Sequence, residues 1–456
     1  MKTGSWFLFF SFFLVACDGP SVSENDGDDA GVLFVDAGSE HRDAGLQVHD
    51  AGEHISASDA GEEIPLVDEE CLENGCLREV RWVGDYAKSV LEDVVSPDVT
   101  LQNGYSIWRV RFFTDGREAR ASVAIPYALS PEIVAQPEGG FHVVMNLPGT
   151  VGVADSCALG NGILGSALAG LFGARGAIGA ALDYPGLGSP GTHPYLVAES
   201  EAHASLDAAR AVLHLATRES VATSGRVAMV GLSQGGHAVL SAAAAHASYA
   251  PDVDVKAFAA VGPASMYFEH WTPSLLFFGE HLVYHALLIW AWSKHYEYAG
   301  PSLWSPALEN DIDDVMEQSC LFSQTGEPTL FEALSEVSSG EEELSADRLF
   351  SPDFLTAFGG GDLTSFPIFS GAFDVNRVRP FVQTAPLLLY QGDSDSVVLK
   401  SSTDELVAAL RAGDVEVDYR VVSGGQHTNI AFGFVANAEL RTEESVQWIF
   451  EQLDVD

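Results

Sequence analysis

The segment Gly231-Leu232-Ser233-Gln234-Gly235-Gly236 has the residue types and the spacing of a nucleophilic turn. It follows an apolar run typical of a strand and leads directly into a helix-forming stretch, the context in which a G-x-S-x-G motif indicates a nucleophilic serine. The flanking glycines allow a strained turn, and the amides of the following helix point at a developing oxyanion. We therefore predict Ser233 as the nucleophile. The alternative is a glycine-rich helix start with an inert N-cap serine.

A serine hydroxyl needs a histidine base that is itself oriented by a carboxylate. The apolar run at residues 386–391 predicts a strand, and Gly392-Asp393-Ser394-Asp395 follows it. Asp393 and Asp395 both lie at the carboxyl end of this strand, where the acid is expected. We favour Asp395, because the extra residues let its side chain turn back toward the crevice. The other aspartate would then cap the turn.

His427 is the candidate base. It lies in the loop Ser423-Gly424-Gly425-Gln426-His427 after the last predicted strand, which gives the chain order Ser, Asp, His. Two other histidines fit less well. His237 is held on the helix that follows Ser233, where packing or a supporting contact is expected. His193 precedes the serine and therefore has the wrong chain order.

An oxyanion hole needs two suitably placed backbone N–H donors. The first is expected to be the amide of Gln234, directly after the serine. The second should come from the loop Leu147-Pro148-Gly149-Thr150 after an earlier predicted strand. Because Pro148 has no amide hydrogen, Gly149 and Thr150 are both candidates.

The elements that must position these residues are predicted from apolar runs that alternate with helical patterns. The predicted strands are 107–113, 119–125, 141–147, 178–183, 226–231, 255–261, 386–391 and 415–422, and the predicted helices are 197–218, 234–246, 403–412 and 443–453. Continuous apolar strands between helices predict a mainly parallel sheet covered on both faces, an α/β fold. The alternation stops at about residues 264–385. We interpret this stretch as a helical cap or lid inserted into one domain, residues 71–456.

With these motifs placed, the chain from about residue 105 onward resembles the secretory lipases of the α/β-hydrolase superfamily. The resemblance rests on Pro148-Gly149-Thr150, Asp155-Ser156-Cys157, Asp183-Tyr184-Pro185-Gly186-Leu187-Gly188, His193-Pro194-Tyr195-Leu196, Ser205-Leu206-Asp207-Ala208-Ala209-Arg210-Ala211, the serine motif, residues 392–398 and His427. The family often has His where this chain has Pro148, and Cys157 is followed by Ala-Leu rather than Ala-Pro-Ser. The resemblance implies an α/β-hydrolase fold with a lid and hydrolysis of carboxylic esters.

The first seventeen residues predict an export signal. Lys2 precedes an apolar run at residues 6–16, which is too short to span a bilayer and fits a signal peptide. The run ends in Leu14-Val15-Ala16-Cys17, which resembles the bacterial lipobox. We therefore predict lipidation at Cys17 and an exported, membrane-anchored bacterial lipoprotein of the cell envelope. An ordinary signal peptide that contains a cysteine is the alternative.

Residues 18–70 predict a disordered acidic tether. They contain 16 acidic residues and one basic residue, and Asp-Ala-Gly recurs five times. The repeat has no apolar seam for a coiled coil and no ligand spacing of a calcium loop. The whole 456-residue chain carries a formal net charge of −43. This balance argues against nucleic acid as a partner, because phosphate binding needs clustered Lys and Arg.

Four cysteines remain once Cys17 is assigned to the anchor. An even number in an exported chain predicts two disulfides. Cys71–Cys76 is the simplest pair because the two residues lie five apart around a glycine, and Cys157–Cys320 would then join distant segments. The spacing matches no common zinc finger, so we predict no metal site.

These residues together predict a serine carboxylic ester hydrolase, a lipase or esterase with an acyl-enzyme and without a cofactor. A serine peptidase, an acyltransferase and a catalytically silent surface-binding module on the same fold are the alternatives. The predicted cap contains Trp271, Trp290, Trp292 and Trp304. These aromatic residues predict either an interfacial lid over an acyl-binding tunnel or simply the core of the cap.

Overall fold

The computed structural model describes residues 71–92, 100–127, 135–274, 279, 281–323, 326–339, 344–427, 429–430 and 442–455. The chain divides into two compact units, Met1–Glu63 and Ile64–Asp456, and every described residue belongs to the second. The predicted signal segment, the lipidation candidate Cys17 and the acidic tether lie outside the described residues.

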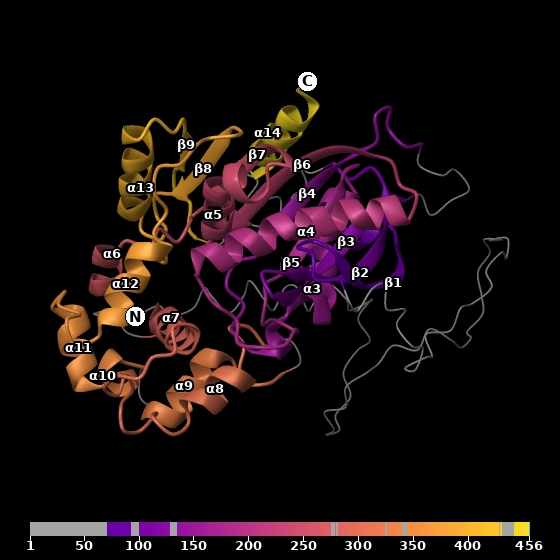
Figure 1. The fold of residues 1–456 in the computed structure, drawn as a ribbon. Coiled ribbons are helices and arrows are strands. Elements are labelled where there is room, and N and C mark those ends of the chain that lie inside the picture. Colours follow the sequence, from indigo (N-terminus) through magenta and orange to yellow (C-terminus); the bar gives the residue numbers. More distant parts are fainter. Residues whose placement is uncertain are drawn as a thin grey trace, which may run out of the picture. The chain divides into compact units, whose positions relative to one another are not determined.

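In the described residues, one mixed sheet of nine strands runs in the order β1-β2-β3-β5-β4-β6-β7-β8-β9 (Figure 1). The strands are β1 (Leu77–Tyr86), β2 (Gly104–Thr114), β3 (Arg117–Tyr127), β4 (Phe141–Leu147), β5 (Ile178–Asp183), β6 (Thr223–Leu232), β7 (Asp254–Val261), β8 (Leu387–Gly392) and β9 (Asp418–Val422). Neighbours from β1 to β5 along this order are antiparallel, and the other neighbours are parallel. The predicted mainly parallel sheet is confirmed.

The hairpin between β2 and β3 follows from two turn residues. Thr114 pairs with Arg117, so only Asp115 and Gly116 lie between the strands. Both adopt positive φ, 47° and 76°, which an Asp-Gly pair tolerates better than most residue pairs. This hairpin lies among the antiparallel strands at one end of the sheet.

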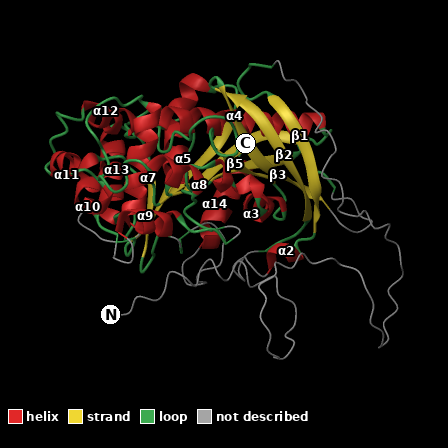
Figure 2. Ribbon diagram, turned by 90° about the horizontal axis from the view of Figure 1, so that it is seen from below, coloured by secondary structure: helices red, strands yellow, loops and turns green. Residues whose placement is uncertain are grey.

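The helices that flank the sheet cover both of its faces (Figure 2). They are α3 (Ile163–Gly173), α4 (Ala198–Arg218), α5 (Gln234–Tyr249), α13 (Lys400–Ala412) and α14 (Thr442–Asp454), with the short α2 (Ser89–Glu92) beside α3. Val143 and Met145 of β4 pack into the core that contains α4, α5 and α13, whereas Val144 packs into the core that contains α3 and α14. Because successive strand residues point to opposite faces, an uninterrupted apolar strand indicates this two-sided burial.

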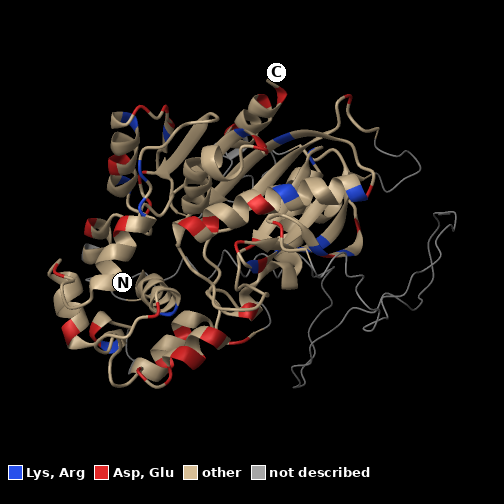
Figure 3. Ribbon diagram, viewed as in Figure 1, with Lys and Arg blue, Asp and Glu red and all other residues tan. Residues whose placement is uncertain are grey.

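The chain between β7 and β8, where the cap is predicted, is helical in its described parts. It holds α6 (Phe268–Ser274), α7 (His281–His295), α8 (Ile312–Gln318), α9 (Leu330–Ser339), α10 (Ala346–Leu349), α11 (Pro352–Gly359) and α12 (Pro367–Asn376). These helices share an apolar core of their own, in which Trp290, Trp292 and Trp304 are buried. Figure 3 shows acidic residues on α8 and α9, and the sequences of both helices contain no Lys or Arg. In the described part of the chain, no helix is both long and apolar enough to cross a membrane.

The disulfide Cys157–Cys320 joins the cap segment to the loop that follows β4. Cys157 ends a short 3-10 helix, Asp155–Cys157, and Cys320 follows α8. Beside the disulfide, the backbone N–H of Leu321 donates to the carbonyl oxygen of Val151 at 2.8 Å. This predicted disulfide therefore fixes the cap next to the loop that carries the oxyanion candidates.

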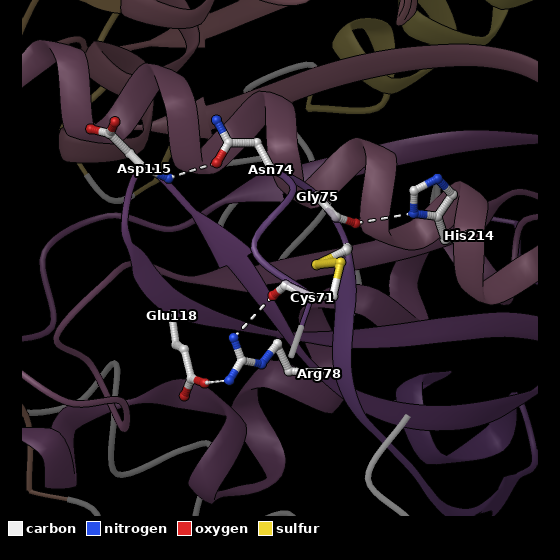
Figure 4. Close-up of a disulfide and its surroundings, with 8 residues drawn as sticks. Cys71, Asn74, Gly75, Arg78, Asp115, Glu118 and His214 are labelled. Carbon is white, nitrogen blue, oxygen red and sulfur yellow. Dashed lines mark hydrogen bonds and ion pairs between the residues drawn. A yellow bond between two sulfur atoms is a disulfide. The ribbon is translucent and has the colours of Figure 1, made fainter. Parts of the chain in front are cut away.

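The second predicted disulfide, Cys71–Cys76, closes a small loop before β1 (Figure 4). Gly75 within this loop adopts a φ of 82°, and its carbonyl oxygen accepts a hydrogen bond from His214 Nδ1 of α4 at 3.1 Å. Arg78 donates to the carbonyl oxygen of Cys71 at 3.0 Å. The disulfide loop is thus held against α4.

A buried carboxylate, Asp183, lies at the end of β5. It accepts hydrogen bonds from the backbone N–H groups of Leu159 at 2.7 Å and Gly160 at 3.0 Å. Burial raises the pKa of Asp183 to about 6, although these amides and two nearby arginines favour the ionised form. Folding therefore favours the protonated acid relative to the unfolded chain.

We expect Asp183 to make the protein more stable at low pH than at neutral pH, relative to an Asp183→Asn variant. Because the pKa is raised on folding, this stabilisation is fully present below about pH 4 and is lost as the pH rises through about 6. The difference in unfolding free energy between wild type and variant should shift by about 2.5 kcal/mol between pH 4 and pH 7.5. Denaturant titrations at both pH values measure it. A difference that does not change with pH would contradict the raised pKa.

Candidate active site

Ser233 lies in a sharp turn between β6 and α5. Its φ of 60° and ψ of −114° are unfavourable for a residue with a side chain. The turn is held in place because the Ser233 N–H donates to the carbonyl oxygen of Val261 at 2.9 Å, at the end of the neighbouring strand β7. The strained turn places the serine at the carboxyl edge of the sheet, next to β7.

The glycines of the serine motif are explained by close contacts between backbones. A Cβ atom on Gly235 would lie 1.8 Å from the carbonyl oxygen of Leu147 at the end of β4. A Cβ atom on Gly231 would lie 2.3 Å from the carbonyl oxygen of Gly235. Any side chain at these two positions would push the first turn of α5 away from the sheet, so the motif is required by packing as well as by the turn.

Asp395 and His427 form a buried pair beside this turn. His427 Nδ1 lies 2.8 Å from Asp395 Oδ2. An ionised carboxylate can only accept, so Nδ1 carries the hydrogen and Nε2 is the basic nitrogen. The other oxygen, Asp395 Oδ1, accepts from the backbone N–H groups of Val397 and Val398, each at 2.9 Å. The loop after β8 therefore fixes the carboxylate and, through it, the histidine ring.

Asp393, the other predicted candidate, faces solvent and has different hydrogen-bond partners. Its Oδ1 accepts from the backbone N–H of Gly424 at 2.7 Å and from the hydroxyl of Ser394 at 3.1 Å. The hydrogen bond from Gly424 lowers the pKa of Asp393. The structure places Asp395 against His427, and it places Asp393 as the cap of a turn.

Gly262 brings the serine turn and the histidine–aspartate pair together. It follows Val261, which binds Ser233, and its own N–H donates to the carbonyl oxygen of Tyr390 in β8 at 2.9 Å. A Cβ atom on Gly262 would lie 3.3 Å from both Asp395 Oδ2 and His427 Nδ1. The three candidate catalytic residues thus converge at the adjacent carboxyl ends of β6, β7 and β8.

The oxyanion candidates lie on the other side of the serine turn. A Cβ atom on Gly149 would be 3.7 Å from the Ser233 Cβ, so this glycine packs directly against the turn. Thr150 is buried, and its hydroxyl shares a hydrogen bond of 2.8 Å with the hydroxyl of Tyr195. The main chain of this loop is therefore next to the serine, and Gly149 and Thr150 both stay candidates beside the amide of Gln234.

A small cavity of about 80 Å³ lies over Ser233 beneath the cap. Its cap residues are His270, Trp271, His281, Tyr284 and His285, and its other residues include Tyr195, Leu196 and the loop at 396–399. Burial lowers the pKa of His285, so this ring lines the cavity as a neutral group at pH 7. The cavity is far smaller than the roughly 300 Å³ at the lower end for drug-sized ligands, so the cap covers the serine closely.

Sequence reasoning did not find Gln391, whose buried side chain holds the acid loop in place. Its Nε2 lies 3.1 Å from Asp395 Oδ2 and 2.9 Å from the carbonyl oxygen of Val398, and its Oε1 accepts from Thr403 at 2.6 Å. A polar residue at the end of the otherwise apolar strand β8 was the available signal. In the described chain, no cluster of three His, Cys, Asp or Glu side chains is arranged to hold a metal ion.

The site can now be compared with known proteins. Residues 169–269, which contain α4 and the serine turn, match the family model described as secretory lipase. The predicted resemblance to the secretory lipases is confirmed. A second family model, described as prolyl oligopeptidase family, matches residues 353–456, which contain Asp395 and His427. No curated protein matches the sequence.

Solved structures with a similar fold support the assigned architecture. The rice cell wall degrading esterase LipA from Xanthomonas oryzae is 18% identical, with a TM-score of 0.61 over 78% of this chain and 92% of that one. Lipase A from Candida antarctica in its closed state is 16% identical, with a TM-score of 0.56 over 84% and 82%. The predicted α/β-hydrolase fold is therefore confirmed.

Proposed function

We propose that this protein is a serine carboxylic ester hydrolase that works through an acyl-enzyme. The observation that carries the proposal is the strained turn of Ser233 beside the buried His427–Asp395 pair. Similarity to lipases and esterases supports an ester as the substrate class. LipA of Xanthomonas oryzae is described as a cell wall degrading esterase and the Candida antarctica protein as a lipase, so the similarity favours esters but does not select one.

In the proposed mechanism, Ser233 Oγ attacks the ester carbonyl carbon while His427 Nε2 takes the serine proton. The amide of Gln234 and an amide of Gly149 or Thr150 stabilise the oxyanion of the tetrahedral intermediate. His427 then gives its proton to the leaving alcohol, and the acyl-enzyme remains. Water repeats the sequence, with the same histidine as base, and releases the acid. Asp395 holds Nδ1–H and stabilises the imidazolium throughout.

A fluorophosphonate probe tests the proposal directly. An activated serine should be phosphonylated, and peptide mass spectrometry should place the adduct on Ser233. Hydrolysis of p-nitrophenyl butyrate should be lost in parallel with labelling. A protein that neither reacts with the probe nor hydrolyses any ester in a broad panel would instead fit the silent surface-binding module.

A serine peptidase is the second candidate, because the segment with the acid and the base matches the prolyl oligopeptidase family model. Acyl transfer to water from an amide would use the same three residues. Peptide p-nitroanilides separate the two functions. Turnover of these amides with kcat/KM above that of the p-nitrophenyl esters would favour the peptidase.

We propose that the helices α6 to α12 act as a lid whose Trp271 limits the acyl group. Three of the four cap tryptophans pack in the core of the cap, and Trp271 alone among the four lines the cavity over Ser233. In a Trp271→Ala variant, the ratio of kcat/KM for p-nitrophenyl octanoate to that for butyrate should rise by about tenfold, because the pocket gains room for methylene groups. Trp271→Phe, which keeps an aromatic ring, should shift the ratio much less. Identical chain-length profiles for all three proteins would sink this assignment.

The similarity to secretory lipases and the two disulfides indicate an exported protein. We propose further that Cys17 carries a lipid anchor that holds the enzyme on a membrane. The acidic surface of α8 and α9 does not favour contact with anionic lipid, so the anchor rather than charge would bring the enzyme to the membrane. Incorporation of labelled fatty acid that persists in a Cys17→Ser variant would contradict this anchor.

A further inference from the structure

Behind the serine turn lies a group of buried polar side chains that the proposed mechanism does not use. Glu201 of α4 is 1% exposed, and His237 of α5 is fully buried. Gln234 and His193, which contact this group, are buried to the same degree. Burying a carboxylate and several polar groups costs free energy unless all of them are paired, so each group is expected to have a hydrogen-bond partner.

The carboxylate of Glu201 has a partner on each oxygen. Its Oε2 lies 2.6 Å from Nδ1 of His237. Its Oε1 accepts from Nε2 of Gln234 at 2.9 Å and from the backbone N–H of Leu196 at 3.1 Å. The carboxylate therefore connects the start of α4 with the first two turns of α5.

His237 extends this network to the cap. Its Nε2 lies 2.9 Å from the carbonyl oxygen of Asn376, at the end of α12. The Asn376 side chain in turn accepts from the backbone N–H of Ala198 at 2.9 Å, in the first turn of α4. Burial lowers the pKa of His237, but the charge of Glu201 and the hydrogen bonds to Glu201 and Asn376 together outweigh burial, so the pKa is raised. Both ring nitrogens thus act as donors, one toward the carboxylate and one toward the cap.

The side chain of Gln234 is held from two sides. Nδ1 of His193 donates to the carbonyl oxygen of Pro185 at 3.1 Å, which leaves its Nε2 to accept from Gln234 Nε2 at 3.0 Å. Burial lowers the pKa of His193 to about 3, so this ring stays neutral and keeps its acceptor. The two hydrogens of the Gln234 amide are therefore directed at two fixed acceptors, Glu201 and His193.

Gln234 is the residue that follows Ser233, and its backbone amide is the first oxyanion donor of the proposed mechanism. We propose that Glu201 and His237 are positioning residues: their ion pair fixes Gln234, and through Asn376 it links the oxyanion hole to the cap. This inference rests on the proposed ester hydrolase function. It assigns the pair no contact with substrate, so the pair acts only through the position of the Gln234 amide.

Two substitutions of Glu201 test the geometric part of the proposal. Glu201→Ala removes the acceptors of Gln234 and should lower kcat for p-nitrophenyl butyrate by about 30-fold with KM within about threefold, because a misplaced oxyanion donor weakens the transition state more than the ground state. Glu201→Gln should restore kcat to within about threefold of wild type. The introduced amide can accept from Gln234 and donate to a neutral His237, whose Nε2–H still binds the Asn376 carbonyl.

His246 provides a matched control on the same helix. It is also buried, and its ring nitrogens also have two partners, the hydroxyl of Thr384 at 2.6 Å and the carbonyl oxygen of Val253 at 2.8 Å. It has no contact with the serine turn. His237→Gln should lower kcat by about tenfold, whereas His246→Gln should leave kcat within about twofold at a comparable loss in Tm. The comparison of His237→Gln with His246→Gln still tests the proposal if Glu201→Ala does not fold.

The outcomes separate the two proposals. Wild-type protein that fails to react with the fluorophosphonate overturns the proposed function itself. With active wild type, kcat that falls equally in His237→Gln and His246→Gln, or equally in Glu201→Ala and Glu201→Gln, overturns the positioning role. A loss of kcat at constant KM, restored by Glu201→Gln and absent from His246→Gln, supports it.

Discussion

Replacing Ser233 by alanine is expected to lower kcat for p-nitrophenyl butyrate by about 10⁵-fold, which is the largest effect of any substitution considered for this protein. The variant keeps the turn, because alanine occupies the same backbone position with the same Cβ atom, and it keeps the hydrogen bond to Val261. Only the attacking oxygen is lost. Steady-state hydrolysis and fluorophosphonate labelling measure the loss, and both signals should disappear together.

Ser241 is the matched control for this substitution. It lies on α5 two turns beyond Ser233, is buried, and does not line the cavity over Ser233. Ser241→Ala should therefore hydrolyse and label as wild type does. If Ser233→Ala retained more than a few per cent of wild-type turnover with unchanged Tm, another residue would have to be the nucleophile.

The sheet could be predicted from the sequence wherever a strand is buried on both faces. The apolar run at 178–183 coincides with β5, and the run at 141–147 with β4. β1 was missed because most positions of this edge strand, Leu77–Tyr86, are only partly buried or exposed, and several carry charged residues. Strand pairing at an edge depends on the neighbour β2, and a local pattern does not show it.

The sequence predicted that the cap is helical, but it did not predict how the helices of the cap pack together. The absence of apolar strand runs indicated where the sheet is interrupted, yet the packing of the described helices α6 to α12 depends on contacts between residues far apart in sequence. Trp271 and Trp292 are equally aromatic in the sequence, and only the fold places the first over Ser233 and the second in the core of the cap.

Some residues of the candidate site could be predicted from local sequence signals, and others depend on tertiary packing. Ser233 and His427 could be found because a turn motif and a chain order are local and ordered signals. The contact between Glu201 and His237 could not, because it depends on how α4 packs on α5. The choice between Asp393 and Asp395 was only partly predictable. Loop geometry favoured Asp395, but the sequence does not show in which direction either side chain points.

The assignment of Asp395 as the acid leads to the second prediction of a large loss in kcat. Asp395→Asn should lower kcat by about 10⁴-fold, because an amide nitrogen facing His427 Nδ1 stabilises the wrong tautomer and removes the charge that stabilises the imidazolium. The hydrogen bonds to Val397 and Val398 can persist through Oδ1, so the loop should keep its shape. The measured quantity is kcat for p-nitrophenyl butyrate from pH 6 to pH 9, with Tm as the check on folding.

Asp393→Asn is the matched control, since it makes the same chemical change two residues away in the same loop. Its Oδ1 can still accept from Gly424 and Ser394, and no hydrogen bond of Asp393 reaches His427 in the described chain. We therefore expect kcat within about threefold of wild type, because only a turn cap is altered. Equal losses in the two variants would mean that the loop as a whole, rather than the Asp395 carboxylate, sustains the histidine. A larger loss in Asp393→Asn would reverse the assignment. The Asp393 carboxylate would then have to leave its hydrogen bonds in the turn and bind His427.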